Sequence, residues 1–287
     1  AILILAGDHI YKMDYRVMMD FHREKDADVT VAVLRLHREE VRAKLGELVV
    51  DSDARAVAFE EKPLRPTGMP GEPDVCLASL GIYAFRPGVL REELDRDAAI
   101  EVSNHDFGRN LLPAMIGRRR VYAFPFELGN RNTDVYWRDV GTLDSYFDAH
   151  MDLVGVVPRF DLYDRSWPIH TVNRPKPPAK IVRGEGDATG AAFDSLLSSG
   201  AIISGGTVVR SVLSPGVVVR SGAHVEESVL LDRVVIGRGA RIRRAILDKR
   251  VVVPDGASIG YDHEADAKIY TVSDGGITVV PKSPFAS

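Results

Sequence analysis

A repeat of 17 residues in the last third of the chain restricts the fold more than any other feature. Four glycines share this spacing: Gly205, Gly222, Gly239 and Gly256. Apolar residues three positions after and three positions before each glycine repeat with them: Val208, Val225, Ile242 and Ile259, then Ile202, Val219, Ile236 and Val253. The pairs Val212-Leu213, Val229-Leu230 and Ile246-Leu247 keep the same interval. Self-similarity at a fixed period indicates an architecture of stacked repeats.

The length of this repeat fits one triangular coil of a hexapeptide-type parallel β-helix, in which three short strands are joined by tight turns at glycine. Inward side chains stack on the same residue one coil away, which favours β-branched residues and Leu. A β-sandwich would tolerate uneven strand spacing. The repeat therefore predicts a β-helix domain over residues 197–287, with at least three coils between about 198 and 262. Four side chains should stack inward: Val208, Val225, Ile242 and Ile259.

Residues 1–155 have a different pattern, in which short apolar runs alternate with amphipathic stretches. This alternation is typical of a mixed α/β sheet. We expect strands at 1–6, 28–36, 48–50, 56–59, 77–85 and 121–127, and helices at 14–25 and about 143–154, the second with Thr142 as N-cap. Residues 156–196 are rich in Pro, Arg and Asp, and we expect them to form a linker.

The first strand, residues 1–6, reads as a buried strand of the parallel type, because Ile and Leu run through it without interruption. A buried strand needs neighbours on both sides. We therefore expect that a segment precedes Ala1 in the natural protein, and that the chain as given is inactive by itself.

Composition excludes several classes of protein. The chain is 45% hydrophobic and 27% charged with a formal net charge of -4, so no basic excess points to nucleic acid. A single cysteine, Cys76, rules out an intramolecular disulfide. The apolar runs are too short to span a bilayer. We expect a cytoplasmic protein that binds neither nucleic acid nor membrane.

Two aspartates sit where α/β sheets bind ligands. Asp8 follows the strand in LAGDHIYKMDY, and Asp139 stands in YWRDVGT, after an apolar stretch and just before a helix. Carboxylates at such positions can hold Mg²⁺ against nucleotide phosphates. If they converge, they form a two-carboxylate Mg²⁺ site. Otherwise Asp8 would cap a turn or helix, and Asp139 would pair with Arg138 or cap the following helix.

Two further motifs carry suitable groups. In FEEKP, Lys62 is followed by Pro63 and offers a point charge for a sugar phosphate, while the neighbouring Glu61 can accept hydrogen bonds from sugar hydroxyls. The alternative is a solvated charge pair at a strand end. SNHDFG, residues 103–108, is either a functional element or an ordinary helix N-cap with Asp106 in the first turn.

In this order and at these intervals, AGDHIYKMDY, FEEKP, LASLGIYAF, SNHDFGRNLLP, YWRDVGTLDSYFDAHMDL and YDRSWPIHT resemble the bacterial ADP-glucose pyrophosphorylases, the glucose-1-phosphate adenylyltransferases of glycogen synthesis. The resemblance covers nearly the whole chain. It implies a Rossmann-like nucleotidyltransferase domain followed by a left-handed parallel β-helix, in an allosteric homotetramer. The glycine-rich loop that holds ATP in this family would precede Ala1.

The resemblance also implies roles for individual residues. Asp8 and Asp139 would carry the catalytic Mg²⁺, and Lys62 would bind the phosphate of glucose 1-phosphate. The glucose pocket would be lined by Glu61, Ser79 and Tyr83, with Trp137 nearby and Asp106 helping to order the site. ATP and glucose 1-phosphate would give ADP-glucose and pyrophosphate. Arg241, Arg243 and Arg244 would offer contacts to an anionic effector, whose identity the sequence leaves open.

Other readings remain. A different sugar-phosphate nucleotidyltransferase would share the fold and the metal site, and a regulatory subunit of the same family would have lost catalysis. An acyltransferase built on the β-helix would need a catalytic histidine between coils, and His224 is the only histidine within the repeat.

Overall fold

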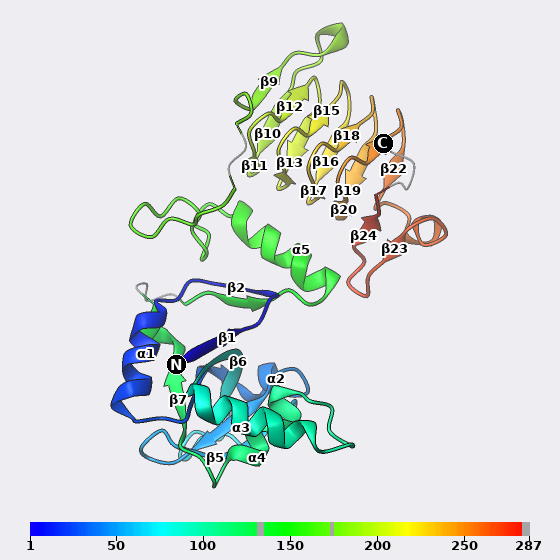
Figure 1. Cartoon of the computed structure of the whole chain (residues 1–287). Helices are drawn as coiled ribbons and strands as arrows, with labels where there is room; N and C mark the ends of the chain where they lie inside the picture. The colour runs from blue at the N-terminus through cyan, green and yellow to red at the C-terminus, as the bar shows by residue number, and fades with distance from the viewer. Residues whose placement is uncertain (131–134, 173–174, 283–287) are drawn as a thin grey trace. The chain divides into compact units, whose positions relative to one another are not determined.

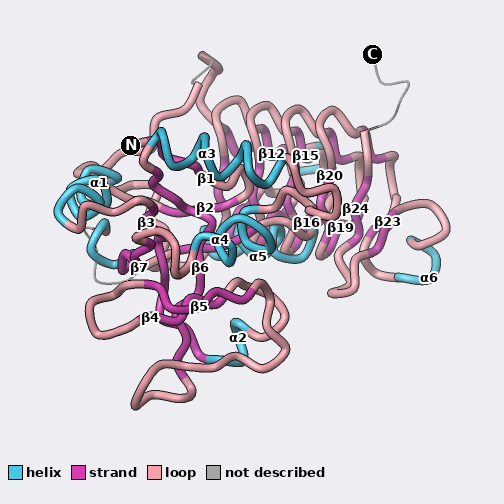
Figure 2. The backbone as a smooth tube through the Cα atoms, turned by 60° about the horizontal axis from the view of Figure 1, so that its bottom comes forward, coloured by secondary structure: helices cyan, strands magenta, loops and turns pink. Residues whose placement is uncertain are grey.

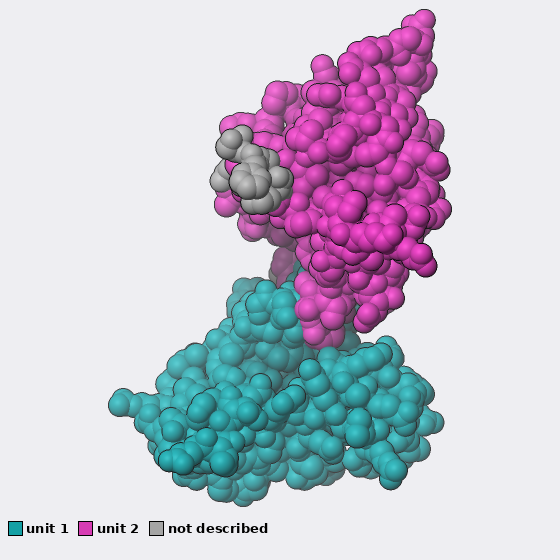
Figure 3. All heavy atoms as spheres, turned by 90° about the vertical axis from the view of Figure 1, so that its right-hand side faces the viewer, with its two compact units in different colours: residues 1–135 teal, residues 136–287 magenta. Residues whose placement is uncertain are grey.

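The computed structural model describes residues 1–130, 135–172 and 175–282. The chain divides into two compact units, Ala1–Val135 and Tyr136–Ser287, which Figure 3 colours separately. Among the described residues, no helix is long and apolar enough to cross a membrane.

The first unit is built on a mixed sheet of six strands in the order β5-β4-β6-β3-β7, with β1 paired to β6 (Figure 1). β3 runs parallel to β7 and antiparallel to β6, and the apolar face of the sheet carries the core of this unit. Cys76 on β6 is buried, and this burial, with the Glu47 carboxylate beside it, raises the pKa of the thiol to about 11. The mixed α/β sheet predicted from residues 1–155 is confirmed.

Most strands of this unit and its first helix follow the segments predicted from the sequence, whereas α2, α3, α4 and the short elements β2, η1 and η2 were not predicted. Asp14 caps the first helix by accepting a hydrogen bond from the Arg16 backbone at 3.0 Å. The strands are β1 (Ile2–Leu5), β2 (His9–Tyr11), β3 (Val29–His37), β4 (Glu47–Val50), β5 (Ala56–Glu60), β6 (Val75–Phe85) and β7 (Val121–Pro125). The helices are α1 (Tyr15–Glu24), α2 (Arg38–Val41), α3 (Pro87–Ala98), the π-helix η1 (Phe107–Leu111), α4 (Leu112–Met115) and the 3-10 helix η2 (Phe126–Gly129).

One expectation about the first strand is wrong. β1 pairs antiparallel with β6, with Ile4 opposite Tyr83, whereas a strand of the parallel type was expected. Ile2 and Leu5 are 41% and 43% exposed. An unbroken apolar run does not indicate the direction in which a strand pairs, because its periodicity is the same in parallel and antiparallel sheets.

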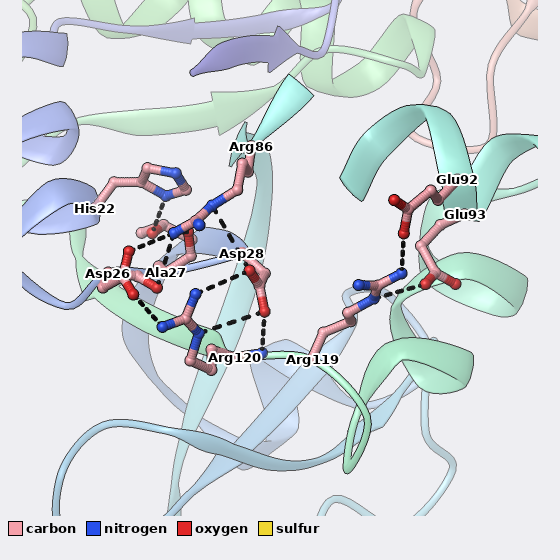
Figure 4. A network of polar contacts seen from close by, with 10 residues as sticks. His22, Asp26, Ala27, Asp28, Arg86, Glu92, Glu93, Arg119 and Arg120 are labelled. Carbon is pink, nitrogen blue, oxygen red and sulfur yellow. Dashed lines mark hydrogen bonds and ion pairs between the residues drawn. The ribbon is translucent and has the colours of Figure 1, made fainter. Parts of the chain in front are cut away.

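An ion-pair network ties together the ends of three neighbouring strands (Figure 4). Asp28 precedes β3, Arg86 follows β6 and Arg120 precedes β7. Asp28 Oδ1 lies 3.2 Å from Arg120 Nη2 and 3.7 Å from Arg86 Nε. Asp26 pairs with both arginines as well. The two guanidinium groups hold the pKa of Asp28 below its usual value against the cost of burial.

In the second unit, three sheets of parallel strands form the β-helix, whose successive coils lie side by side in Figure 2. Their orders are β21-β18-β15-β12-β9, β10-β13-β16-β19-β22 and β11-β14-β17-β20-β24-β23, where only the final pair is antiparallel. The four predicted inward residues, Val208, Val225, Ile242 and Ile259, are at most 3% exposed and stack in register. The predicted β-helix is confirmed.

The repeat is shifted by one position in one coil. Ile203, rather than Ile202, pairs with Val219 and is fully buried. The corner from Ile203 to Gly205 is one residue shorter than the corner from Val219 to Gly222. The inward side chain therefore moves one place closer to the glycine.

The coils begin earlier than predicted, inside the segment assigned as a linker. β9, β10 and β11 pair with β12, β13 and β14. Ile181 pairs with Ile203, 22 residues on, whereas Leu197 pairs with Leu213, 16 residues on. Because these spacings depart from 17, the repeat of the sequence did not include this coil.

A ladder of serines stabilises one corner of the β-helix. Ser195, Ser211 and Ser228 occupy equivalent places in successive coils. Each hydroxyl donates to the carbonyl two residues earlier at 2.7 Å. Each also accepts from the backbone N–H of the coil above, at 3.1 to 3.2 Å, and the series ends at Ala245. The ladder provides hydrogen-bond partners for backbone groups at the corner, where the chain leaves one sheet for the next.

Helix α5 belongs with the β-helix by its packing, although the prediction placed it at the end of the first domain. Its Phe147 lies in one apolar cluster with Val229, Ile246 and Ile277. Thr142 caps the helix as predicted, in a reciprocal pair with Ser145. The compact units accordingly divide between residues 135 and 136, so that α5 lies in the second one.

The remaining elements of the second unit are short. The helices are α5 (Leu143–Met151), α6 (His263–Asp266) and the 3-10 helices η3 (Asp152–Val154) and η4 (Glu185–Asp187). The strands up to the middle of the β-helix are β8 (Trp137–Asp139), β9 (Lys180–Val182), β10 (Ala191–Phe193), β11 (Leu196–Leu197), β12 (Ile202–Ser204), β13 (Thr207–Val209), β14 (Val212–Leu213), β15 (Val218–Val219) and β16 (His224–Glu226). The others are β17 (Val229–Leu230), β18 (Val235–Ile236), β19 (Arg241–Arg243), β20 (Ala245–Leu247), β21 (Val252–Val253), β22 (Ser258–Ile259), β23 (Thr271–Val272) and β24 (Thr278–Val280).

Candidate active site

Four of the residues predicted to bind the sugar come together in the first unit. Glu61 follows β5, Ser79 and Tyr83 lie on β6, and Asp106 precedes η1. The carboxylates of Glu61 and Asp106 act electrostatically on each other and on the Tyr83 phenol. Three separate segments of the chain thus contribute to one polar cluster, which we call the sugar pocket after the role predicted for it.

The Glu61 carboxylate of the sugar pocket is partly buried. Its partial burial raises its pKa, and the negative charge of Asp106 raises it further. Lys62 and Arg109 act in the opposite direction, because a nearby cation favours the ionised form. Two glycines leave room for this side chain: a Cβ on Gly108 or Gly46 would lie 2.5 Å or 2.8 Å from Glu61 Oε2.

Ser79 and Tyr83 form the buried wall of the sugar pocket. Tyr83 is 8% exposed, and burial raises the pKa of its phenol, while the nearby Ser79 hydroxyl partly offsets that rise. The ring of Phe107 stacks on Tyr83 with centroids 5.7 Å apart. Among the described residues, Ser79 Oγ is buried without a partner in good hydrogen-bond geometry. Such a group normally finds a partner.

Lys62 is exposed and has an unusual backbone conformation, with φ at 52°. Such conformations of residues other than glycine cost about 1 to 3 kcal/mol and cluster at functional sites. The next residue, Pro63, is buried and accepts a backbone hydrogen bond from Ala43. This anchoring fixes the point from which the lysine side chain leaves the chain.

SNHDFG forms a different cap from the one considered above. Asp106 is itself the N-cap of η1, and its Oδ1 accepts from the Arg109 backbone N–H at 2.7 Å. Asp106 therefore does not lie in the first turn of a helix capped by Ser103. The Ser103 hydroxyl instead donates to Asp97 Oδ1 at 2.7 Å. The π-helix that follows is a rare geometry that occurs frequently at functional sites.

Asp8 lies in the turn after β1, and its side chain is 56% exposed. Its Oδ1 is 3.7 Å from His9 Nε2, beyond hydrogen-bond distance.

Asp139 and Trp137 lie on β8 in the second unit, where Trp137 is half-buried and Asp139 is exposed. Asp139 Oδ1 accepts from the Gly141 backbone N–H at 2.7 Å. The structural roles considered for Asp139 are filled by other residues, because Arg138 pairs with Asp152 at 2.7 Å and Thr142 caps α5. Asp8 and Asp139 belong to different units, so their convergence stays a prediction.

The arginines expected to contact an effector lie on β19 and directly after it. Arg241 and Arg243 place their guanidinium groups 4.3 Å and 4.7 Å from the centre of the Tyr261 ring. Arg244 Nη1 lies 3.8 Å from Glu227 Oε2. A role in binding an anion stays a prediction.

Sequence reasoning missed several residues that shape the sugar pocket. Gly46 and Gly108 were not identified as giving space to Glu61, nor Phe107 as the stacking partner of Tyr83. Phe107 and Gly108 stand within SNHDFG, so this motif was the signal that could have identified them. Gly46 belongs to none of the motifs identified in the sequence.

Comparison with known proteins agrees with both halves of the chain. Residues 1–155 match the family described as nucleotidyl transferase. Residues 177–280 match the family described as GlmU-like, C-terminal hexapeptide, which together with the parallel sheets confirms the left-handed β-helix. The hexapeptide match begins at 177, ahead of β9, in agreement with the early start of the coils.

Curated relatives cover nearly the whole chain. A glucose-1-phosphate adenylyltransferase of Rhodopirellula baltica is 50% identical over 98% of this chain and 64% of the relative. Those of Koribacter versatilis and Shewanella baltica are 48% and 45% identical, each over 98% of this chain and 67% of the relative. The chain thus spans about two thirds of the length of these relatives. It belongs to the nucleotidyl transferase family, within the group of the glucose-1-phosphate adenylyltransferases.

Proposed function

We propose that the protein transfers an adenylyl group from ATP to glucose 1-phosphate, giving ADP-glucose and pyrophosphate for glycogen synthesis. The relatives' names support this reaction. The observation that carries it is the sugar pocket, in which two carboxylates, a buried hydroxyl and a phenol lie close together, with an exposed lysine near Glu61. Such a set of acceptors and donors suits a phosphorylated sugar.

Each residue then has a distinct role. Lys62 binds the phosphate of glucose 1-phosphate as a point charge. The Glu61 and Asp106 carboxylates accept hydrogen bonds from sugar hydroxyls, and Ser79 pairs with another. The Tyr83 ring forms the wall of the sugar pocket, and Trp137 lies near the glucose.

Nucleotidyl transferases of this family generally use a divalent metal, and we propose Mg²⁺. Asp8 and Asp139 fit it, since both are exposed carboxylates and Mg²⁺ prefers oxygen ligands from few protein groups. When bound, the metal neutralises phosphate charge.

The protein itself mainly positions the reactants. An oxygen of the sugar phosphate attacks the α-phosphorus of ATP in line, and the bond from the α-phosphorus to the pyrophosphate oxygen breaks. No nucleophile from the protein is needed, because the attacking phosphate is already ionised. Lys62 holds that phosphate and the sugar pocket fixes its direction, so catalysis is largely orientation and charge stabilisation.

The alternatives lead to different outcomes. Another sugar-phosphate nucleotidyltransferase would prefer a different nucleotide, and a regulatory subunit would bind but not react. The presence of Asp8, Lys62 and Asp139 argues against lost catalysis. The homotetramer, the control by metabolites and the cytoplasmic location stay predictions.

The test is pyrophosphate release by the full-length protein from glucose 1-phosphate with ATP, UTP, GTP or dTTP. ATP should be preferred, and Asp8→Asn and Asp139→Asn should each lower kcat by about 100-fold or more with the fold intact. Asp53→Asn, an exposed aspartate in the β4–β5 turn, is the control and should react normally. Preference for another nucleotide, or near-normal kcat in both variants at saturating Mg²⁺, would contradict the proposal.

A further inference from the structure

A cluster of three side chains joins the end of α3 to the loop in front of η1. Asp97, near the end of α3, is buried at 8% exposure. Its Oδ1 accepts from the Ser103 hydroxyl and its Oδ2 bonds to His105 Nδ1, each at 2.7 Å. Ser103 Oγ also accepts from the His105 backbone N–H at 3.0 Å. We call these three residues the loop clamp.

The protonation of the loop clamp follows from its chemistry. The Ser103 hydroxyl and the His105 ring hold the pKa of Asp97 below its usual value, so the carboxylate is ionised at neutral pH. An ionised carboxylate only accepts hydrogen bonds, so Nδ1 of His105 carries the hydrogen. Both bonds are therefore charge-assisted.

The residues that directly follow the loop clamp form one side of the sugar pocket. Asp106 acts on Glu61, Phe107 stacks on Tyr83, and Gly108 leaves space for Glu61. His105 adopts φ of 55°, which turns the chain between the loop clamp and these three residues. A movement of His105 would therefore move one wall of the sugar pocket.

The loop has little else to hold it. From residue 99 to residue 106, every residue except Ser103 is exposed, and Val102 is 91% exposed. At its start the backbone N–H groups of Ala99, Ile100 and Ser103 donate to Arg96 O, Asp97 O and Ile100 O at 3.0 to 3.3 Å, and at its end Asp106 is bonded to Asn110 and Leu111 of η1. A loop with so few buried groups opens at low cost in free energy, unless specific bonds close it.

We propose that Asp97 is a positioning residue for the sugar pocket, which acts through Ser103 and His105 to keep Asp106 and Phe107 against Glu61 and Tyr83. This role rests on the proposed function of that pocket. Asp97 does not touch the substrate, so its loss should weaken the binding of glucose 1-phosphate and leave the ATP site unchanged.

Kinetics of the full-length protein test the positioning role. Asp97→Ala should raise the KM for glucose 1-phosphate by about 10-fold, the scale of a lost charge-assisted contact, and should change the KM for ATP by less than about twofold. Asp97→Asn keeps an acceptor for the Ser103 hydroxyl, so its KM for glucose 1-phosphate should lie between those of the parent protein and Asp97→Ala. Asp95→Ala is the matched control, because Asp95 lies on the same helix, is 76% exposed and pairs only weakly, with Arg91 at 3.8 Å. The control should resemble the parent protein.

Hydrogen exchange tests the loop clamp without relying on the reaction. Asp97→Ala should speed exchange of the amides from 100 to 111 relative to Asp95→Ala, while the β-helix amides stay protected. Unchanged exchange would overturn the loop clamp, and faster exchange with an unchanged KM for glucose 1-phosphate would overturn its role in positioning. If the parent protein makes no ADP-glucose, the proposed function fails, and the loop clamp is then judged by exchange alone.

Discussion

A methyl group added at Gly108 is the sharpest probe of the sugar pocket. An alanine Cβ there would lie 2.5 Å from Glu61 Oε2 and 3.1 Å from its Cδ. Ordinary contacts of a Cβ begin at 3.4 Å. The Glu61 carboxylate must therefore retreat by about 1 Å, and a displacement of about 1 Å in a positioning group can lower the rate by about 100-fold.

The fold should tolerate this substitution. Gly108 does not have a positive φ, and it lies within η1, where alanine is favoured over glycine by about 1 kcal/mol in helical backbone. We expect Gly108→Ala to lower kcat/KM for glucose 1-phosphate by about 10 to 100-fold without loss of stability.

Gly88→Ala provides the control. An added Cβ at Gly88, in the first turn of α3, meets nothing within 4 Å. Kinetics should be unchanged, and the free energy of unfolding should be equal or higher by up to about 1 kcal/mol. The assay is pyrophosphate release at varied glucose 1-phosphate, with urea unfolding of both variants. A folded Gly108→Ala protein with the parent kcat/KM would show that Glu61 does not bind the sugar.

Three further predictions concern single side chains. Lys62→Ala should raise the KM for glucose 1-phosphate by roughly 10 to 1000-fold with a smaller effect on ATP, and an unchanged KM would leave Lys62 as a solvated surface charge. Ser228→Ala removes the acceptor for the buried Ala245 N–H and should lower the free energy of unfolding by about 1 to 3 kcal/mol in urea titrations. Ser258→Ala, at an exposed serine, is the control and should change it by less than about 0.5 kcal/mol. Equal effects of the two substitutions would contradict a stabilising role of the serine ladder. Burial, with Arg86 nearby, lowers the pKa of His22 below 6.5, so the unfolded chain takes up the proton first as the pH falls. The free energy of unfolding should therefore decrease as the pH drops through about 6.5, by at most about 1.4 kcal/mol per pH unit, and His22→Asn should remove this dependence.

The β-helix could be predicted in detail because its stacking leaves a direct record in the sequence. Each inward residue contacts its equivalent one coil away, so Val208, Val225 and Ile242 repeat at the interval of the coil. The first coil escaped the prediction because its spacings differ. A trace of it was present, since Phe193 to Leu197, FDSLL, shares the serine of the ladder and the following apolar pair with later coils.

Most strands of the first unit and its first helix could also be predicted from local pattern, because hydrophobic periodicity reflects burial. Strand pairing was not. β1 runs antiparallel to β6, and nothing in its apolar run indicates direction. Likewise α5 has a clear cap in the sequence, but only the contact of Phe147 with Val229 and Ile246 shows that it packs on the β-helix.

For the sugar pocket, the sequence determined which residues carry suitable chemistry, because motifs such as FEEKP and SNHDFG place carboxylates, a lysine and glycines at fixed positions. The tertiary structure decided which of them meet. Glu61 and Asp106 are 45 residues apart in the chain, and only the approach of η1 to the end of β5 brings their charges together. The link from Asp97 to His105 was equally invisible, since a hydrogen bond between side chains depends on where a loop folds back, and no local pattern encodes that.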